Sequence, residues 1–307
     1  NSRRAREELV LAERISRRRR RRKKRKIKIN VVRMAVCAVI LVGVIIGIYN
    51  LGTTIAGALH GGGKGGSAAA NFSGFYYYEE DRRDRYADYA ARHPQLTAEE
   101  VVWRVGADID LPFYTNISEI NDVYANPLLV NKYNRLPEDY TPGDIINTSF
   151  GHQMTSDTKA AYESMRDAAG KEGFHISAFS AYRSIEYQKG LYNRRLLEKD
   201  ISEVDSLCAR GGHSEHHTGR AVDIVGPGGT TENFAGTPEA EWLKNNASRF
   251  GFIVRYTDEN SDVTGYQAAP WHVTYVGVNI AEKMRAEGIE SLEEYVVKFV
   301  NHTPPEQ

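Results

Sequence analysis

Three histidines and an aspartate lie within one short stretch of the chain, His213 to Ile224, which reads HSEHHTGRAVDI. Imidazole nitrogens and carboxylate oxygens are common protein ligands of zinc, and a catalytic zinc site usually takes three protein ligands. His216 and Asp223 lie seven residues apart, roughly 23–25 Å if the chain were extended. The chain must therefore double back if both are to hold one ion, and Gly219 is the residue that could permit the turn.

The residues after Gly219 predict a strand, RAVDIV, in which Ala221 and Asp223 share one face. The small alanine beside the aspartate leaves room for an ion. A third ligand is offered by His272, at the start of a second predicted strand within APWHVTYVG. From these residues alone two interpretations stay open: a metal site built by His216, Asp223 and His272, or a polar loop that leads into a strand.

The elements that must position these residues follow one another irregularly from about residue 150. Helices are predicted at 156–173, with Ser156 as N-cap, at 184–200 and at 237–251, with Thr237 as N-cap and Pro238 in the first turn. Strands are predicted at 174–182, 220–225, 252–256 and 271–277, and two short helices follow them. Because helices and strands do not alternate regularly, the predicted class is α+β with a small antiparallel sheet flanked by helices.

The N-terminal part of the chain has a different charge from the rest. The whole chain of 307 residues has a formal net charge of zero, but residues 1–33 carry 16 Lys or Arg against 3 Asp or Glu. The remainder therefore has a net charge of −13. Such a basic run could contact nucleic acid or anionic lipid, and the residues that follow it favour the membrane.

Residues 34–59 contain no charged residue and begin with a strongly apolar run. A helix that crosses a bilayer needs about 20 mostly apolar residues, and basic residues before it keep that end in the cytoplasm. We therefore predict a basic cytoplasmic tail at 1–33, one transmembrane helix at 34–59, and the rest of the chain outside the cell membrane, with no nucleic-acid partner. A cleaved signal peptide is the alternative.

Between this helix and the compact domain lie two further segments. Residues 60–74 are rich in glycine and predict a flexible linker. Residues 75–125 predict a stalk or lead-in that is partly helical, because Thr97 and Glu100 have the spacing of a capping box. The compact domain is predicted at 126–302.

Several motifs of this domain resemble those of the zinc D-alanyl-D-alanine carboxypeptidases related to VanY. SEHHTGRAVD fits that family's pattern S-x-H-x-x-G-x-A-x-D, PWHVTYVG resembles its second motif, and SAYRS resembles its third. LVNKYNRLPEDYTPGDI resembles the segment with which the family's domain begins, so the resemblance covers about residues 127–277. It implies the fold of the zinc D,D-peptidases, which is shared with Hedgehog proteins.

Carried over by motif, the resemblance makes His216, Asp223 and His272 the ligands of one zinc ion. It places Arg183 where the family has an arginine that faces the substrate, and a guanidinium suits an oxyanion or a terminal carboxylate. A surface salt bridge is the alternative role for Arg183. Ser214 and Gln188 are weaker candidates for substrate binding. Trp271 is expected to pack in the core, and His213 and His217 to be loop residues or neighbours of the ligands.

The sequence departs from the family pattern at one catalytic position. The family has a glutamate three residues before the last zinc histidine, where it serves as general base, and this chain has Ala269 there. Since general acid–base catalysis commonly contributes about 10²–10⁴-fold, we expect the chain to be inactive or strongly impaired. An engineered substitution and a natural pseudo-enzyme both fit this observation.

The function that the resemblance implies is a membrane-anchored, extracellular zinc carboxypeptidase that removes the terminal D-alanine from peptidoglycan stem peptides. Its partners would be stem peptides that end in D-alanine and, through the helix and the basic tail, the membrane. One alternative is a zinc-stabilised module that binds peptidoglycan without cutting it or reports it as a sensor. A further alternative is an L,D-carboxypeptidase or a cross-link endopeptidase.

Overall fold

The computed structural model describes residues 71–148 and 151–305, which belong to one compact unit, Ala70–Gln307. The predicted cytoplasmic tail at 1–33 and the predicted transmembrane helix at 34–59 lie outside the described residues, as does most of the predicted linker. Within the described ranges, no helix combines the length and the apolar character that crossing a bilayer requires.

A four-stranded antiparallel sheet forms the centre of the unit, in the order β5-β6-β8-β7. Its strands are β5 (Ser177–Ser180), β6 (Ala221–Val225), β7 (Phe252–Tyr256) and β8 (Ala269–Tyr275). All five residues of β6 are buried, as expected for a strand covered on both faces. The predicted α+β class with a small antiparallel sheet is confirmed.

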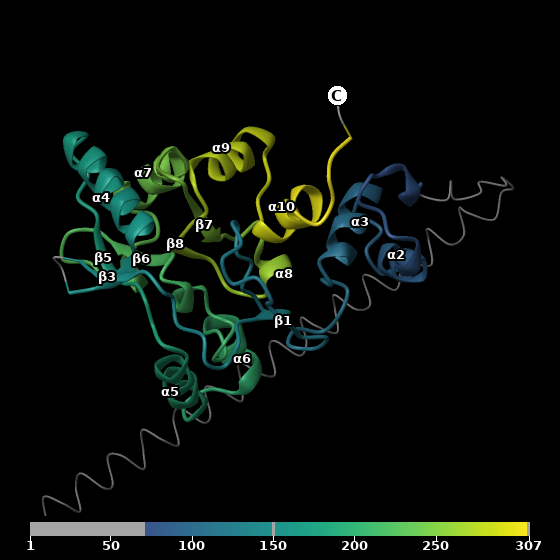
Figure 1. Cartoon of the computed structure of the whole chain (residues 1–307), viewed down its shortest axis with the longest axis horizontal. Coiled ribbons are helices and arrows are strands. Elements are labelled where there is room, and N and C mark those ends of the chain that lie inside the picture. The colour runs from purple at the N-terminus through teal and green to yellow at the C-terminus, as the bar shows by residue number, and fades with distance from the viewer. Residues whose placement is uncertain (1–70, 149–150, 306–307) are drawn as a thin grey trace, which may run out of the picture. The chain divides into compact units, whose positions relative to one another are not determined.

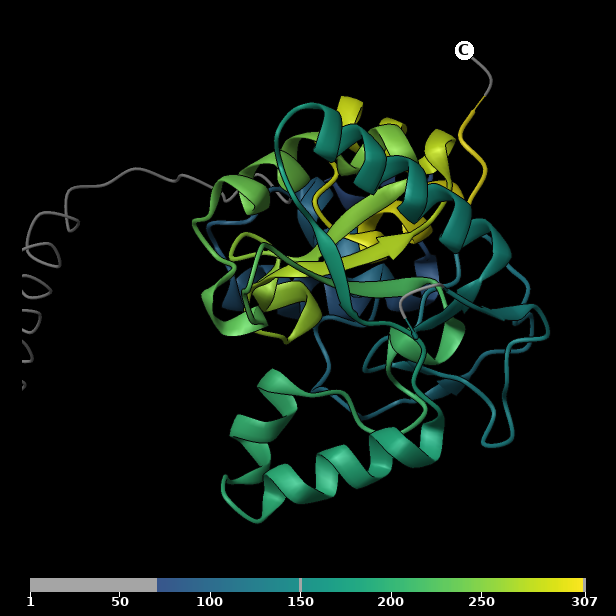
Figure 2. The same cartoon turned by 90° about the vertical axis from the view of Figure 1, so that its left-hand side faces the viewer.

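Helices pack around this sheet, and Figures 1 and 2 show α4, α7 and α9 together on one side of it. The helices of this region are α4 (Ser156–Lys171), α5 (Ile185–Leu196), α6 (Ile201–Leu207), α7 (Pro238–Asn246), α8 (Ser261–Thr264), α9 (Val278–Glu287) and α10 (Leu292–Phe299). Two small sheets complete it, β1 (Ser118–Glu119) with β2 (Asn134–Arg135) and β3 (Ile145–Asn147) with β4 (Gln153–Thr155).

Local sequence signals explain where several helices begin and end. Thr237 caps α7 by accepting a hydrogen bond from the backbone N–H of Ala240, and Pro238 occupies the first turn, as predicted. The prediction of Ser156 as N-cap is wrong by one residue, because the side chain of Thr155 accepts the capping hydrogen bond of α4. The predicted helix at 184–200 ends at Leu196, and α6 follows as a separate helix.

The lead-in segment at 75–125 packs on the rest of the unit. It contains α2 (Arg83–Arg92) and α3 (Ala98–Gly106), and the predicted capping box between Thr97 and Glu100 is present. Val101, Val102 and Val105 of α3 share an apolar cluster with Val297 of α10. A hydrogen-bonded ion pair from Lys298 to Glu99 joins the same two helices. Burial of this cluster attaches the lead-in segment to α10.

Candidate metal centre

Strand pairing brings two of the predicted ligands together. In the antiparallel pair of β6 and β8, Asp223 lies directly opposite His272, and side chains of such residues on the same face are neighbours. The Nδ1 atom of His272 lies 3.1 Å from Oδ1 of Asp223. Both side chains are buried. The sheet register therefore brings together two of the three candidate ligands.

His216 reaches the same place from the loop before β6. It lies in a 3-10 turn, η3 (Glu215–Thr218), which ends at Gly219 with a φ of 68°. That φ is in the left-handed region, which glycine adopts at little cost, so the predicted turn at Gly219 is confirmed. The turn places Nε2 of His216 3.3 Å from Oδ2 of Asp223.

Hydrogen bonds fix which nitrogen each histidine turns toward the site. Nδ1 of His216 lies 2.6 Å from the carbonyl oxygen of Ala181, and a carbonyl can only accept, so Nδ1 carries the proton and Nε2 has the free lone pair. Nε2 of His272 lies 3.2 Å from a carboxylate oxygen of Glu215. His272 therefore donates from Nε2 and directs Nδ1 toward Asp223.

These three residues fit a zinc ion. One ligand atom from each of His216, Asp223 and His272 lies within 4.8 Å of the others. Two ligands of a tetrahedral zinc ion, each bonded at about 2.0–2.2 Å, lie about 3.3–3.6 Å apart. The distances of 3.3 Å and 3.1 Å to the Asp223 oxygens are close to that range. Two imidazoles and one carboxylate would leave the fourth position open, as in catalytic zinc sites.

The electrostatics of the site keep two of the three candidate ligands, His216 and Asp223, in the form that binds a cation, whereas they favour the protonated form of His272. Burial lowers the pKa of His216 to about 4, and the nearby Arg183 guanidinium acts in the same direction, so this imidazole is neutral at pH 7. Burial alone would raise the pKa of Asp223, but its contacts with His216 and His272 hold it well below the ordinary value. Burial also opposes protonation of His272, yet its hydrogen bonds to Asp223 and Glu215 raise its pKa.

The three residues line a cleft of about 570 Å³. The cleft is also lined by every other residue that the sequence singled out for catalysis or substrate binding: Arg183, Gln188, Ser214 and Ala269. Phe179, Tyr187 and Leu207 contribute apolar lining, and all three are exposed. A cleft with apolar walls and a few polar groups that converge on one point is the usual form of a small-ligand site.

Arg183 lies against the candidate metal ligands. Its Nη2 donates to Oδ2 of Asp223, and its Nε donates to the hydroxyl of Ser180 at 2.9 Å. Its backbone is held on both sides, because its N–H donates to the carbonyl of His216 and its carbonyl accepts from Nδ1 of His217. The guanidinium is therefore fixed beside the site rather than paired at the surface.

The comparisons with known proteins agree with this geometry. The family described as VanY, D-alanyl-D-alanine carboxypeptidase, matches residues 151–278. A protein of Bacillus subtilis (strain 168) that is named as a carboxypeptidase, YodJ, is 31% identical over 208 residues, which cover 62% of this chain and 76% of that protein. The chain belongs to the VanY family of D-alanyl-D-alanine carboxypeptidases.

Two solved structures are similar to this member of the VanY family. The LdcB LD-carboxypeptidase has a TM-score of 0.55 and 33% identity, and the match covers 60% of this chain and 91% of that one. A glutamate-to-alanine mutant of the vancomycin resistance D,D-pentapeptidase VanY, in complex with Zn(II), has a TM-score of 0.50 and 31% identity. That match covers 55% of this chain and 97% of the other.

The remaining predicted residues have local partners. The side-chain amide of Gln188 donates to the carbonyl of Ala209, while its Oε1 is buried and finds no hydrogen-bond partner among the described residues. The hydroxyl of Ser214 accepts from the backbone N–H of His216. Trp271 packs against the core beside the sheet, as predicted, although it also lines the cleft.

His213 and His217 do not join the ligands. Nδ1 of His213 donates to the carbonyl of Asn131. His217 donates from Nδ1 to Arg183 and accepts the N–H of Gly212 at Nε2. Both imidazoles therefore form hydrogen bonds with backbone groups around the loop, in agreement with their predicted role.

Ala269 begins β8 and lies opposite Tyr256 in the sheet. Apart from Asp223, the carboxylate that lines the cleft is Glu232, which is exposed. Glu259 and Asp262, which precede β8 in sequence, do not line the cleft, and Asp262 pairs with Arg104 instead. Among the described residues that line the cleft, Asp223 is therefore the only buried carboxylate.

Sequence reasoning missed Glu215 and Thr274, which contact Nε2 of His272, and the pair of Arg255 and Glu293, which binds Glu215 through Arg255. Arg255 and Glu293 are fully buried. One signal for them exists in the sequence, because Arg255 interrupts the apolar strand FIVRY. A buried charge needs a partner of opposite charge, but the sequence does not say which residue that is.

Proposed function

We propose that this protein is a zinc carboxypeptidase of peptidoglycan stem peptides that end in D-alanine, and that Ala269 leaves it inactive or strongly impaired. The observation that carries the proposal is that His216, Asp223 and His272 meet in one cleft with Arg183 beside them. The family's activity supports the substrate class. The Zn(II) complex of the related VanY mutant supports the choice of metal.

The residues of the cleft suggest how such a peptide would be held. Arg183 has donors that suit a terminal carboxylate or the oxyanion of a cleaved amide. Gln188 lines the same cleft, and its buried Oε1 has no hydrogen-bond partner among the described residues, so a rotation of this side chain would let it accept a hydrogen bond from a peptide N–H. When bound, zinc would polarise the scissile carbonyl and lower the pKa of water to about 7.

Proton transfer is the step that this chain lacks. A methyl group at position 269 cannot take a proton from water or give one to the leaving amine. The loss of a general acid–base commonly costs about 10²–10⁴-fold in rate. A protein of this kind would still bind stem peptides, which keeps open the alternative of a binding or sensor module.

The test is to restore the missing carboxylate. Ala269→Glu, loaded with zinc, is expected to release D-alanine from a stem pentapeptide about 10²–10⁴-fold faster than the parent protein. Ala269→Gln is the matched control, because it has nearly the same size and polarity and no acid–base function. It is expected to remain at the parent's rate.

The same assay separates the alternatives. Release of D-alanine from a tetrapeptide but not from a pentapeptide would indicate an L,D-carboxypeptidase, and cleavage of cross-linked dimers would indicate an endopeptidase. If zinc-loaded Ala269→Glu cleaves none of these substrates, the enzyme proposal is wrong. Binding of the uncleaved peptide by that variant would then favour the binding module.

We further propose that the domain acts outside the cell, tethered by residues 34–59. The uncharged run after a strongly basic segment supports this arrangement, and it would place the domain near the cell wall. The expected result is that the protein stays with membranes in carbonate washes and that protease added to intact cells degrades the domain. Release of the full chain into the soluble fraction would contradict it.

A further inference from the structure

A buried carboxylate lies directly behind one of the candidate zinc ligands. Oε2 of Glu215 is 3.2 Å from Nε2 of His272, on the side of the ring away from Asp223. The hydroxyl of Thr274, two residues along β8, donates to the same oxygen at 2.6 Å. Glu215 therefore accepts two hydrogen bonds at the atom that faces His272.

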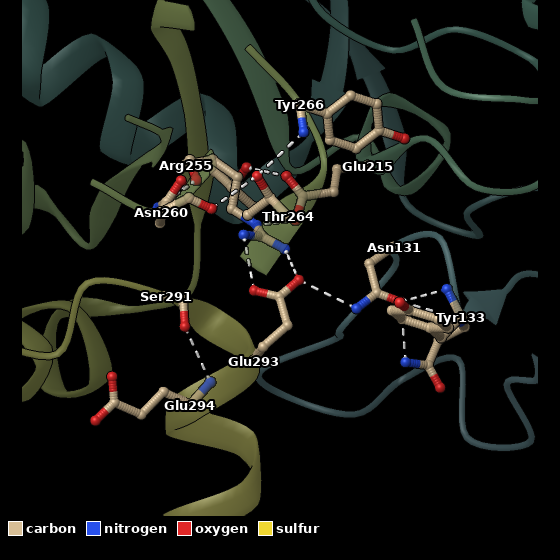
Figure 3. A network of polar contacts seen from close by, with 12 residues as sticks. Asn131, Tyr133, Glu215, Arg255, Asn260, Thr264, Tyr266, Ser291, Glu293 and Glu294 are labelled. Carbon is tan, nitrogen blue, oxygen red and sulfur yellow. Dashed lines mark hydrogen bonds and ion pairs between the residues drawn. The ribbon is translucent and has the colours of Figure 1, made fainter. Parts of the chain in front are cut away.

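Glu215 is itself held by a buried ionic network, which Figure 3 shows. Nε of Arg255 donates to Oε1 of Glu215 at 2.8 Å. The two Nη atoms of Arg255 donate to the two oxygens of Glu293 at 3.1 Å and 2.7 Å. The side-chain amide of Asn131 donates to Glu293 at 3.1 Å. Loop, sheet and α10 thus meet at one charged cluster.

Burying the charged groups of this cluster in the core costs desolvation free energy. The side chains of Glu215, Arg255 and Glu293 are each only 1% exposed. Apolar residues of similar volume commonly stabilise an interior as well as a buried ion pair does. Two carboxylates and one guanidinium also leave a net negative charge, which suits a position behind a cation site. The cluster is therefore better explained by what it does for the site than by stability alone.

We propose that Glu215 is a positioning residue of the metal centre. Its carboxylate accepts a hydrogen bond from Nε2–H of His272, so that Nδ1 presents its lone pair to the ion, and Arg255 holds Glu215 in place. This inference rests on the proposed zinc site, and it adds a residue that neither spacing nor motif assigned to it. A carboxylate behind a ligating imidazole fixes the ring's orientation and tautomer.

Glu215→Gln tests the hydrogen bond with little change in shape. Arg255 can only donate, so it selects the amide oxygen of a glutamine at position 215. The NH₂ group would then face Thr274 and Nε2 of His272. Two donors cannot share a hydrogen bond, and the imidazole is driven to carry its proton on Nδ1. That tautomer has no lone pair to offer the ion.

Glu293→Gln is the matched comparison. It removes one negative charge from the same buried network, but Glu293 contacts Arg255 and Asn131 and not His272. If the hydrogen bond matters rather than the charge, the two variants will differ in zinc affinity. The affinity is measured by competition with a chromophoric chelator, in parallel with circular dichroism to confirm folding.

We expect Glu215→Gln to lose about 10–100-fold in zinc affinity, as is common when a partner of a ligating histidine is removed. We expect Glu293→Gln to lose less than about threefold, because the bond from His272 to Glu215 remains. Equal losses in the two variants, or a folded Glu215→Gln that binds zinc as tightly as the parent, would overturn the proposal. Failure of the parent itself to bind zinc would instead overturn the proposed function.

A second measurement needs no variant. In the zinc-loaded parent, ¹⁵N NMR of the imidazoles is expected to show a proton on Nε2 of His272 and the metal on Nδ1. His216 is expected to show the reverse, since its Nδ1 donates to Ala181. A metal bound through Nε2 of His272 would refute the role of Glu215 even if Glu215→Gln did not fold.

Discussion

Replacing Arg255 by methionine tests the charged network through the stability of the fold. Methionine has a similar volume but no charge, so the variant leaves Glu215 and Glu293 buried beside each other without the guanidinium that pairs with both. Removing one partner of a buried ion pair commonly costs about 3–5 kcal/mol, because the remaining charge is left uncompensated. For a unit of this size we expect the melting temperature to fall by about 6–20 °C.

The dependence of this loss of stability on pH follows from the ionisation of the Glu215 carboxylate. Burial alone would raise the pKa of Glu215, but Arg255, together with the hydrogen bonds from His272 and Thr274, lowers it to about 2, below the ordinary 4.5. A lowered carboxylate pKa stabilises the parent above pH 4.5, and this contribution is lost as the pH falls toward 2. In Arg255→Met, burial raises the pKa of the carboxylate without the opposing effect of the guanidinium. Lowering the pH then protonates the carboxylate and removes the unpaired buried charge that destabilises the variant. The difference in unfolding free energy between the parent and Arg255→Met is therefore largest near pH 7 and becomes smaller as the pH is lowered toward 4.

Urea denaturation at several pH values measures this difference. EDTA should be present, so that zinc binding does not add to the stability of either protein. The double variant Arg255→Met, Glu293→Gln is expected to recover about half of the loss, because one unpaired carboxylate has been removed. A loss below about 1 kcal/mol at pH 7, or a loss that does not change with pH, would refute the reasoning.

Three further predictions concern the centre and its loop. Asp223→Asn is expected to weaken zinc binding by more than about 100-fold in a chelator competition, because an amide is a poor zinc ligand; unchanged affinity would contradict the assigned site. His217→Ala should cost about 2 kcal/mol or more in urea, since one buried N–H and one partly buried carbonyl of the backbone lose their partner. Because burial lowers the pKa of His217 to about 4, the parent should lose stability as the pH falls from 6.5 toward 4. An equal loss of stability in His217→Ala over that range would show that protonation of His217 is not the cause. Gly219→Ala should destabilise by about 1–3 kcal/mol, because φ is 68° and a Cβ atom would lie 3.2 Å from the backbone nitrogen of Thr155; a melting temperature equal to the parent's would contradict it.

Much of the local structure could be predicted because its causes are local. Thr97 with Glu100, and Thr237 with Pro238, are signals that act within one helical turn, and both are present in the structure. Gly219 was predicted from the need to reverse the chain, and its positive φ agrees. The errors are local as well: two adjacent hydroxyl residues compete to cap α4, and α6 has few residues from which a period could be recognised.

By itself the sequence predicted the chemistry of the centre: two histidines and an aspartate around a glycine turn, an arginine nearby and, by resemblance to the family, an alanine at the position of a general base. Only the tertiary structure decided how the centre is held. Glu215 meets His272 across 57 residues of chain and Arg255 across 40, and Arg255 meets Glu293 across 38. Such partners depend on the register of β6 with β8 and on the packing of α10 against the sheet. A carboxylate can pair with any cation that the fold brings near it, so no local pattern of residues specifies which one.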